Sequence, residues 1–355
     1  MSLADRSLRR IVKLPLYGVL CGALLAGAGS PGHGAEVDGP QVSWVFSAWG
    51  NKRAQTAGIE ALAEEVAKAT GGRFTIDIKY AEAISPVKEN LDGLKIGAFD
   101  AAMFCASYHP GKTPALTGLD LPLLPIPDLD TRQAVHEAYF RQPAIVEEMK
   151  RWNSHLVMSL MLPSSEIMGK GKPPRAPEDW KGRRVHSVGY VGKVLSSLGA
   201  TTTSFPAPEL YTALERNTID AVVFPFTYAF VAYRIHELSQ WYTTNLALGA
   251  PVCPVAASLA SWDALPPQYR ELIENRKPAA YEALKQAYRA ADEKNFPLLE
   301  RQGAEPITYT DAQRAQFSEA AEPVWRLWVA DREKENIPGA ALLQSIMDAA
   351  KAAGK

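Results

Sequence analysis

The stretch DWKGRRVHSVG, residues 179–189, concentrates basic side chains that could hold an anionic ligand. Its first residues are typical of a polar turn, and residues 183–188 are predicted to form a strand. Because side chains alternate between the two faces of a strand, Arg184 and His186 share one face. Such a basic strand end is either a solvated edge or the floor of an anion site, and these residues alone leave both interpretations open.

Short motifs of catalysis or metal binding are missing from the sequence. It contains no CxxC pair, no HExxH helix and no GxSxG turn, and its six histidines have no cysteine or carboxylate at ligand spacing. A single GxGxxG match, residues 27–32, neither follows a predicted strand nor opens a predicted helix. We therefore expect a protein that is not an enzyme and that uses no cofactor and no metal.

The composition narrows the possible partners. The chain has 355 residues, enough for two domains, and its 38 Lys and Arg residues nearly balance 39 Asp and Glu residues. A protein that binds nucleic acid through its phosphates usually shows a strong basic excess. We expect no nucleic-acid partner.

The first residues are typical of an export signal. Basic residues are followed by an apolar stretch, residues 14–28, and then by small residues, so cleavage after Ala35 is predicted. The alternative is an uncleaved membrane anchor. Cleavage predicts a periplasmic protein that retains two cysteines, Cys105 and Cys253. One disulfide is possible in that oxidising compartment, but the spacing of two cysteines alone does not decide between bridged and free thiols.

The pattern along the chain predicts an α/β fold. Residues 42–47 are predicted to form a strand, residues 54–70 a helix and residues 74–80 a second strand, which is a βαβ unit. Further predictions are a helix at residues 131–152, strands at 157–162 and 183–188, a helix opening at residue 263 and a long helix at 278–302 that bends near Pro297.

Two segments of the chain echo each other. LKIGAFDAAMF (94–104) and LERNTIDAVVF (214–224) share Leu, a turn residue, Asp and Phe at the same offsets. Gly97 and Asn217 are residue types that tolerate the left-handed conformation that closes a helix. The echo indicates either two lobes of similar plan or a common helix-to-strand connection repeated by chance. If two lobes exist, a ligand is expected in the crevice at their strand ends.

Aromatic side chains follow these predicted strand ends and could line the crevice or belong to the core. One follows the first strand, two follow the first echo and three close or follow the second: Trp49, Phe104, Tyr108, Phe224, Phe226 and Tyr228.

The segment PEDWKGRRVHSVGYVGKVLSSLGATTTSFPAPELYTALERNTIDAVVF resembles the solute receptors of tripartite ATP-independent periplasmic (TRAP) transporters, the DctP-like family. The similarity continues in ALAEEVAKATGGRFTIDI, LKIGAFDAAMF, SWDALPPQYRELI and LERQGAEPI. It implies a monomeric receptor whose two lobes close over a small organic solute, which is then passed to an ion-gradient-driven permease. A sensor kinase as the partner is the alternative. The implied division is lobe I at 36–162 and about 250–277, lobe II at 163–249 and about 303–355, and a spanning helix at 278–302.

The resemblance also shows departures at the positions that hold the ligand in the family. The family's carboxylate-clamping arginine is matched by His186, and Arg184 matches the lysine two residues earlier. A second arginine of some members is matched by Glu166, and an asparagine by Phe224. Because a dicarboxylate beside Glu166 without an arginine would be costly, we expect an amine or a neutral or aromatic ligand. One alternative is a carboxylate bound by His186 and Arg184, with His186 protonated. The other is a His186 that only packs, while Arg183 or Arg184 reaches the ligand.

Overall fold

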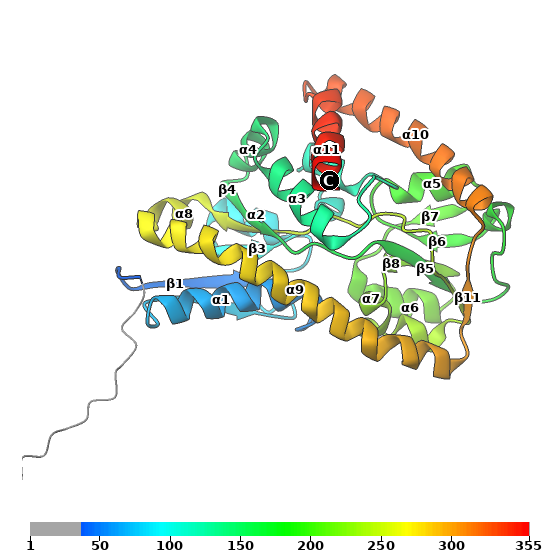
Figure 1. Ribbon diagram of the computed structural model, residues 1–355, viewed down its shortest axis with the longest axis horizontal. Helices are drawn as coiled ribbons and strands as arrows, with labels where there is room; N and C mark the ends of the chain where they lie inside the picture. Colours follow the sequence, from blue (N-terminus) through cyan, green and yellow to red (C-terminus); the bar gives the residue numbers. More distant parts are fainter. Residues whose placement is uncertain (1–36, 355) are drawn as a thin grey trace, which may run out of the picture. The chain divides into compact units, whose positions relative to one another are not determined.

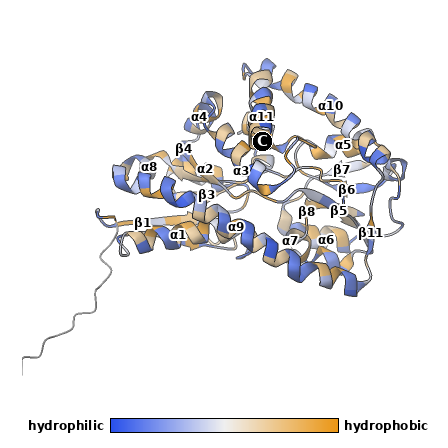
Figure 2. Ribbon diagram, in the orientation of Figure 1, coloured by the Kyte–Doolittle hydropathy of each residue, from blue (hydrophilic) through white to orange (hydrophobic). Residues whose placement is uncertain are grey.

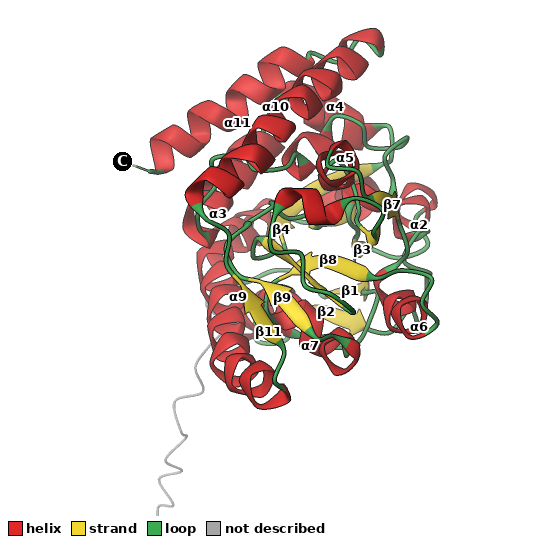
Figure 3. Cartoon of the chain, turned by 90° about the vertical axis from the view of Figure 1, so that its right-hand side faces the viewer, coloured by secondary structure: helices red, strands yellow, loops and turns green. Residues whose placement is uncertain are grey.

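The computed structural model describes residues 37–354. The predicted export signal and its cleavage point lie outside these residues. Within them the chain forms two sheets covered by helices, and the strands of both sheets lie inside the layer of helices (Figures 1 and 3).

The first sheet is mixed and grows from the predicted βαβ unit. Its strand order is β2-β1-β3-β10-β4, in which β1, β2 and β3 are parallel and β10 is antiparallel to both neighbours. Buried side chains such as Phe46 and Phe74 face the helices that cover it. The strands are β1 (Val42–Ser47), β2 (Phe74–Lys79), β3 (Ala101–Met103), β4 (Ser154–Ser159) and β10 (Pro254–Ser258).

The helices of this first lobe differ in one place from the predicted pattern. A single helix was expected at residues 131–152, but the chain forms two, because Pro143 lacks the N–H that would continue the first helix and instead opens the second. The helices are α1 (Ala57–Ala69), α2 (Asn90–Ile96), α3 (Leu129–Phe140), α4 (Pro143–Lys150) and α8 (Leu259–Ala264).

The second sheet carries six strands in the order β11-β9-β5-β8-β6-β7. Strand β6 pairs in parallel with β7 and β8, so this sheet contains three adjacent parallel strands, as the first sheet does. The strands are β5 (Ser165–Gly169), β6 (Arg184–His186), β7 (Thr201–Thr203), β8 (Ala221–Pro225), β9 (Trp241–Thr243) and β11 (Glu305–Ile307), with helices α5 (Val191–Ser197), α6 (Leu210–Glu215) and α7 (Tyr228–Ala232).

The two echo segments have the same local structure, one in each sheet. Helix α2 ends at Gly97 (φ 70°) and leads to β3, while α6 is followed by Asn217 (φ 56°) and leads to β8. Both turn residues adopt the left-handed conformation that their types predicted. The chain is therefore built from two lobes in which a corresponding strand ends at a corresponding place.

Three segments connect the lobes. The chain passes from β4 to β5 and returns from β9 to β10, and these two crossings hydrogen-bond to each other: Leu160 N–H donates to the carbonyl of Cys253 (2.9 Å) and Ser165 N–H to that of Gly249 (2.7 Å). Helix α9 (Pro267–Gln302) packs against α1 in the first lobe and α7 in the second (Figure 1).

Helix α9 starts eleven residues earlier than the predicted 278–302, because Pro267 opens the helix and Pro278 lies inside it. Hydrophilic residues occupy much of the length of this helix (Figure 2). Between residues 37 and 354 no helix has both the length and the apolar character needed to span a membrane.

The chain ends in α10 (Asp311–Lys334) and α11 (Gly339–Ala353). The expected division placed residues 303–355 with lobe II. Helix α10 does contact α5 of that lobe, but α11 packs against α3 of the first lobe. The C-terminal helices therefore bridge both lobes, which differs from the expected assignment.

Candidate functional site

A cavity lies between the two sheets, at the strand ends of both lobes. The first lobe contributes residues that follow β1 and β3, and the second contributes the ends of β6 and β8 and the start of α7. Aromatic rings dominate the lining: Trp49, Tyr108, Phe224, Tyr228 and Tyr233. Trp49 and Tyr108 meet edge to face with ring centroids 6.0 Å apart.

His186 lines the cavity at the end of β6 and is 1 % exposed. Burial lowers the pKa of its imidazole to about 3, and its Nδ1 accepts a hydrogen bond from the Phe205 N–H at 3.2 Å. These facts define a neutral ring with its proton on Nε2. The expected alternative of a protonated His186 that binds a carboxylate does not fit this environment.

Arg184 lies outside the cavity lining, although it shares a strand face with His186. It stands at the start of β6, away from the strand end that meets the cavity, and its guanidinium makes a bidentate contact with Asp220 (3.1 Å from Nε to Oδ2). The Arg184 side chain is 47 % exposed, so this basic strand end is a solvated ion pair. Arg184 has no contact with the space in which a ligand would lie.

Glu166 on β5 is buried but faces the loop that follows β9. Its carboxylate accepts hydrogen bonds from the Thr243 hydroxyl (2.5 Å), the Leu246 N–H (3.2 Å) and the Ala247 N–H (2.8 Å). Burial raises the pKa of this carboxyl, and the three donors partly offset the rise. The structure therefore places Glu166 in a backbone-binding role and not in the cavity lining.

Two of the six aromatic candidates also lie outside the lining. Phe104 is fully buried in the first lobe, where it meets His109 edge to face. Phe226 stacks on Tyr242 and meets Phe296 of α9. Phe104 points the opposite way from its neighbour Cys105, which lines the cavity, whereas Phe226 lies beyond the end of β8 and packs toward α9.

Several polar atoms at the cavity are buried without a hydrogen-bond partner within the described part of the chain. They come from five lining residues: Trp49 Nε1, Gln55 Nε2, Ser107 Oγ, Asp120 Oδ2 and Tyr233 Oη. A buried polar atom without a partner costs about 1–3 kcal/mol. Five such atoms around one cavity are therefore available to hydrogen-bond a ligand.

Asp120 is the only acidic residue of the lining, and it was not predicted from the sequence. Its Oδ1 accepts a hydrogen bond from the Val252 N–H (2.5 Å), whereas Oδ2 has no partner. Burial raises the pKa of this carboxyl to about 8. The group is therefore mostly protonated at pH 7, and as a carboxylic acid it can donate or accept a hydrogen bond.

No Lys or Arg residue lines the cavity, but Arg53 lies directly behind the lining. Its guanidinium is 4.3 Å from the centroid of the Trp49 ring and donates to Gln55 Oε1 at 2.7 Å. Arg53 and Gln55 were also not predicted from the sequence. The available signal was their place in the turn directly after the first strand, four and six residues beyond Trp49.

Cys105 and Cys253 form a disulfide at the floor of the cavity. They face each other where β3 and β10 run antiparallel, so the open question of their pairing is settled by strand neighbours that are 148 residues apart in sequence. Within residues 37–354, no cluster of three or more His, Cys, Asp or Glu side chains could hold a metal ion.

Two lobes with an aromatic cavity between them, joined by paired crossings and a spanning helix, are the arrangement of a two-lobe solute-binding protein. Residues 46–331 match the family model of the bacterial extracellular solute-binding proteins, family 7 (DctP). The chain belongs to this family, and the receptor function implied by the sequence resemblance is confirmed.

Similar proteins agree with this assignment. The chain is 24 % identical to the monocarboxylate 2-oxoacid-binding periplasmic protein of Nostoc sp. (strain PCC 7120), over 78 % of each chain. A TRAP solute-binding protein from Rhodoferax ferrireducens T118, solved with copurified benzoate, has a TM-score of 0.80 at 20 % identity and covers 88 % of this chain and 99 % of its own. A marine metagenome TRAP protein with 3-hydroxybenzoate has a TM-score of 0.79 at 21 % identity, with 89 % and 100 % covered. At this identity the structures show the common fold.

Proposed function

We propose that this protein is a periplasmic receptor, released by cleavage near Ala35, that captures an aromatic monocarboxylate and delivers it to a TRAP permease. The observation that carries the ligand class is the cavity itself: aromatic walls, five unpaired polar atoms and no Lys or Arg in the lining. Aromatic faces favour a flat, largely apolar ligand. A dicarboxylate would need a cationic partner at each end, whereas Arg53 supplies a cation at one end only, beside Gln55.

The structure gives less support to an amine ligand than the sequence did. That hypothesis needed Glu166 as an anionic partner, and Glu166 is bound to the loop after β9. Asp120 remains as the carboxyl in the lining, but its raised pKa leaves it mostly uncharged at pH 7. The cation of Arg53 lies behind Trp49 and Gln55, and it favours a ligand with one negative charge over an ammonium ion.

Solved relatives support this choice of ligand class. The structures from Rhodoferax ferrireducens and the marine metagenome carry benzoate and 3-hydroxybenzoate, and the Nostoc relative is named for monocarboxylate 2-oxoacids. Each of these ligands has a single carboxylate. The permease as partner rests on the TRAP assignment of the solved structures, and a sensor kinase remains the competing partner.

The test uses mature protein that has been unfolded and refolded to remove bound solute. A thermal-shift panel would contain benzoate, hydroxybenzoates, mandelate, 2-oxo acids, succinate, choline and an aromatic amine. We expect the largest rise in Tm with aromatic monocarboxylates. The largest rise with succinate or with amines would contradict the proposal. Uptake of the identified ligand by vesicles that contain a TRAP permease, with and without the receptor, would test delivery.

A further inference from the structure

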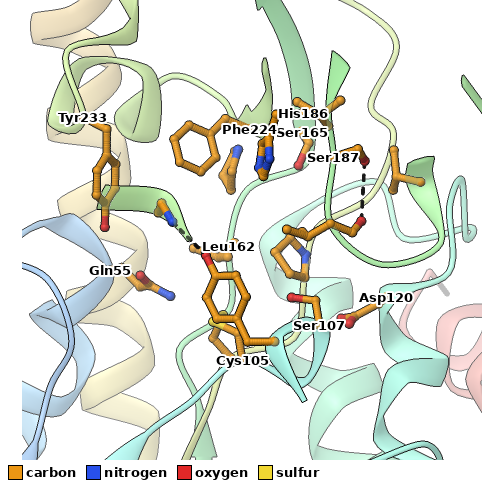
Figure 4. A pocket seen from close by; sticks show the side chains of 18 of the residues that line it. Gln55, Cys105, Ser107, Asp120, Leu162, Ser165, His186, Ser187, Phe224 and Tyr233 are labelled. Atoms are coloured by element: carbon orange, nitrogen blue, oxygen red, sulfur yellow. Dashed lines mark hydrogen bonds between the residues drawn. A yellow bond between two sulfur atoms is a disulfide. The ribbon is translucent and has the colours of Figure 1, made fainter. Parts of the chain in front are cut away.

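The cavity has two chemically different ends. Gln55 and Tyr233 lie on one side, and Asp120 and Ser107 lie on the opposite side (Figure 4). Each side carries buried polar atoms without a partner. A ligand that satisfies both sides must therefore present one polar group at each end, and the chemistry of each end restricts what that group is.

At the first end, the orientation of the Gln55 amide is fixed. Its Oε1 accepts a hydrogen bond from Arg53 Nη2 (2.7 Å) and lies 3.5 Å from the Tyr228 hydroxyl. The amide nitrogen is consequently the atom left without a partner, and it can only donate. The Tyr233 hydroxyl is a second unpaired group at this end.

Arg53 itself is held in place behind Gln55. Its Nη1 donates to the carbonyls of Trp49 and Asn51, both at 2.9 Å. Burial raises the pKa of the Tyr233 hydroxyl, and the Arg53 cation offsets part of that rise. The negative charge of Glu82 acts in the opposite sense and raises the pKa of Tyr233, and one oxygen of Glu82 accepts a hydrogen bond from the Val87 N–H. Donors backed by a fixed cation favour a carboxylate at this end.

The opposite end suits an uncharged hydroxyl. Asp120 Oδ2 and Ser107 Oγ are both unpaired there. Because burial holds the pKa of Asp120 at about 8, its carboxyl is mostly protonated at pH 7 and does not repel a ligand that carries a negative charge elsewhere. A phenolic hydroxyl can donate to Asp120 and accept from Ser107, or the reverse.

We propose that the cavity binds a hydroxylated aromatic acid in one orientation, with its carboxylate at Gln55 and Tyr233 and its hydroxyl at Asp120 and Ser107. This inference rests on the proposed function and adds the direction of binding. Gln55 contacts the ligand, whereas Arg53 is a positioning residue: it fixes the Gln55 amide and supplies positive charge without touching the ligand.

The experiment measures Kd by calorimetry at pH 7 for benzoate, 3- and 4-hydroxybenzoate and benzamide. In the unaltered protein, we expect one hydroxybenzoate to bind about tenfold more tightly than benzoate. Ser107→Ala and Asp120→Ala should remove that preference, so that the hydroxybenzoate and benzoate bind with similar Kd values. If Asp120→Ala fails to fold, Ser107→Ala alone tests the hydroxyl end of the cavity.

The carboxylate end has its own readout. Arg53→Met and Gln55→Glu should weaken benzoate about tenfold or more while weakening benzamide, its uncharged analogue, much less. Gln316→Glu on the exposed side of α10 is the matched control and should change neither ligand. A purely structural role of Arg53 would weaken benzoate and benzamide equally, and that result would overturn the inference.

Failure of the inference can be told from failure of the proposed function. If aromatic acids bind but the four variants affect all probes alike, the orientation is wrong and the receptor assignment stands. If Arg53→Met removes the hydroxyl preference instead, the ligand lies the other way round. If no aromatic acid binds, the proposed ligand class fails, and the orientation fails with it.

Discussion

At the scale of single residues, the site depends on which side chains have their hydrogen bonds satisfied inside the protein. Glu166 has three donors of its own and needs no ligand, whereas Asp120 has one donor for two oxygens. Both are buried carboxyls, and sequence alone gives no reason to separate them. The structure separates them by their partners, and mutations should do the same.

Replacing Glu166 with Gln should destabilise the fold and leave ligand binding intact. The new amide NH₂ would replace one of the two oxygens and face either the Leu246 N–H or the Ala247 N–H, so one of these donors loses its acceptor. We expect a loss of about 1–3 kcal/mol in the free energy of unfolding, measured by urea titration. The Kd of the ligand should change less than twofold, as in the exposed control Glu319→Gln. A large loss of affinity would return Glu166 to the site.

Asp120 should make the stability of the ligand-free protein fall as pH rises. Its pKa is about 8 in the folded chain and about 3.9 when unfolded. Between these values the folded state retains a proton that the unfolded state has lost, so the stabilising contribution is present at low pH and is lost as pH rises through the folded value.

Asp120→Asn removes this dependence and should reduce the fall in Tm between pH 6 and pH 9. Glu148, whose pKa burial raises to about 7, contributes in the same direction in both proteins, so part of the fall should remain. The exposed control Asp263→Asn should behave like the unaltered chain. Equal pH profiles for Asp120→Asn and the unaltered chain would show that the Asp120 carboxyl does not keep its proton in the folded chain.

Sequence patterns predicted some of the residues that line the cavity. Strand ends followed by aromatics led to Trp49, Tyr108 and Tyr228, which line the cavity. Arg53 and Gln55 were not predicted because they lie in a turn and a short 3₁₀ segment, where no periodicity indicates which way a side chain points.

At the scale of elements, the structure is built from two copies of one connection. A helix, a left-handed turn residue and a short buried strand recur as α2–β3 and α6–β8, and each copy was visible in the sequence because turn chemistry is local. The helix pair α3 and α4 was less predictable. Apolar spacing continues across residues 131–152, and only Pro143 marks the break.

Gly97→Ala should cost about 1 kcal/mol of stability through backbone strain alone. A methyl group at this position meets no atom within 4 Å, so packing adds nothing, but φ is 70°. Gly111→Ala is the matched control, because its added methyl also meets open space while its φ lies outside the left-handed region. We expect Gly111→Ala to be neutral or slightly stabilising in urea titration. Equal effects of the two substitutions would argue against the left-handed turn.

At the scale of the whole described molecule, residues 37–354, the lobes meet across the cavity through few polar contacts. The Ala207 N–H of the second lobe donates to the Tyr108 hydroxyl of the first (3.2 Å), and the Tyr228 hydroxyl lies 3.5 Å from Gln55 Oε1. The fold class and the presence of two lobes followed from the sequence. Their contacts did not, because they join loops about 100 residues apart or more.

Tyr108→Phe should weaken ligand binding about tenfold by destabilising the closed arrangement of the lobes. Phenylalanine keeps the edge-to-face contact with Trp49 but leaves the Ala207 N–H without its acceptor, a loss of about 1–3 kcal/mol that applies only when the lobes are together. The effect should lie in koff, measured by stopped flow, because closing contacts slow release more than they speed encounter. Tyr211→Phe on α6, outside the cavity, is the control. Small-angle scattering of the ligand-saturated variant should still show closed lobes, which distinguishes a weaker contact between the lobes from a lost binding site. An unchanged koff would mean that the Tyr108 hydroxyl does not hold the lobes together over the ligand.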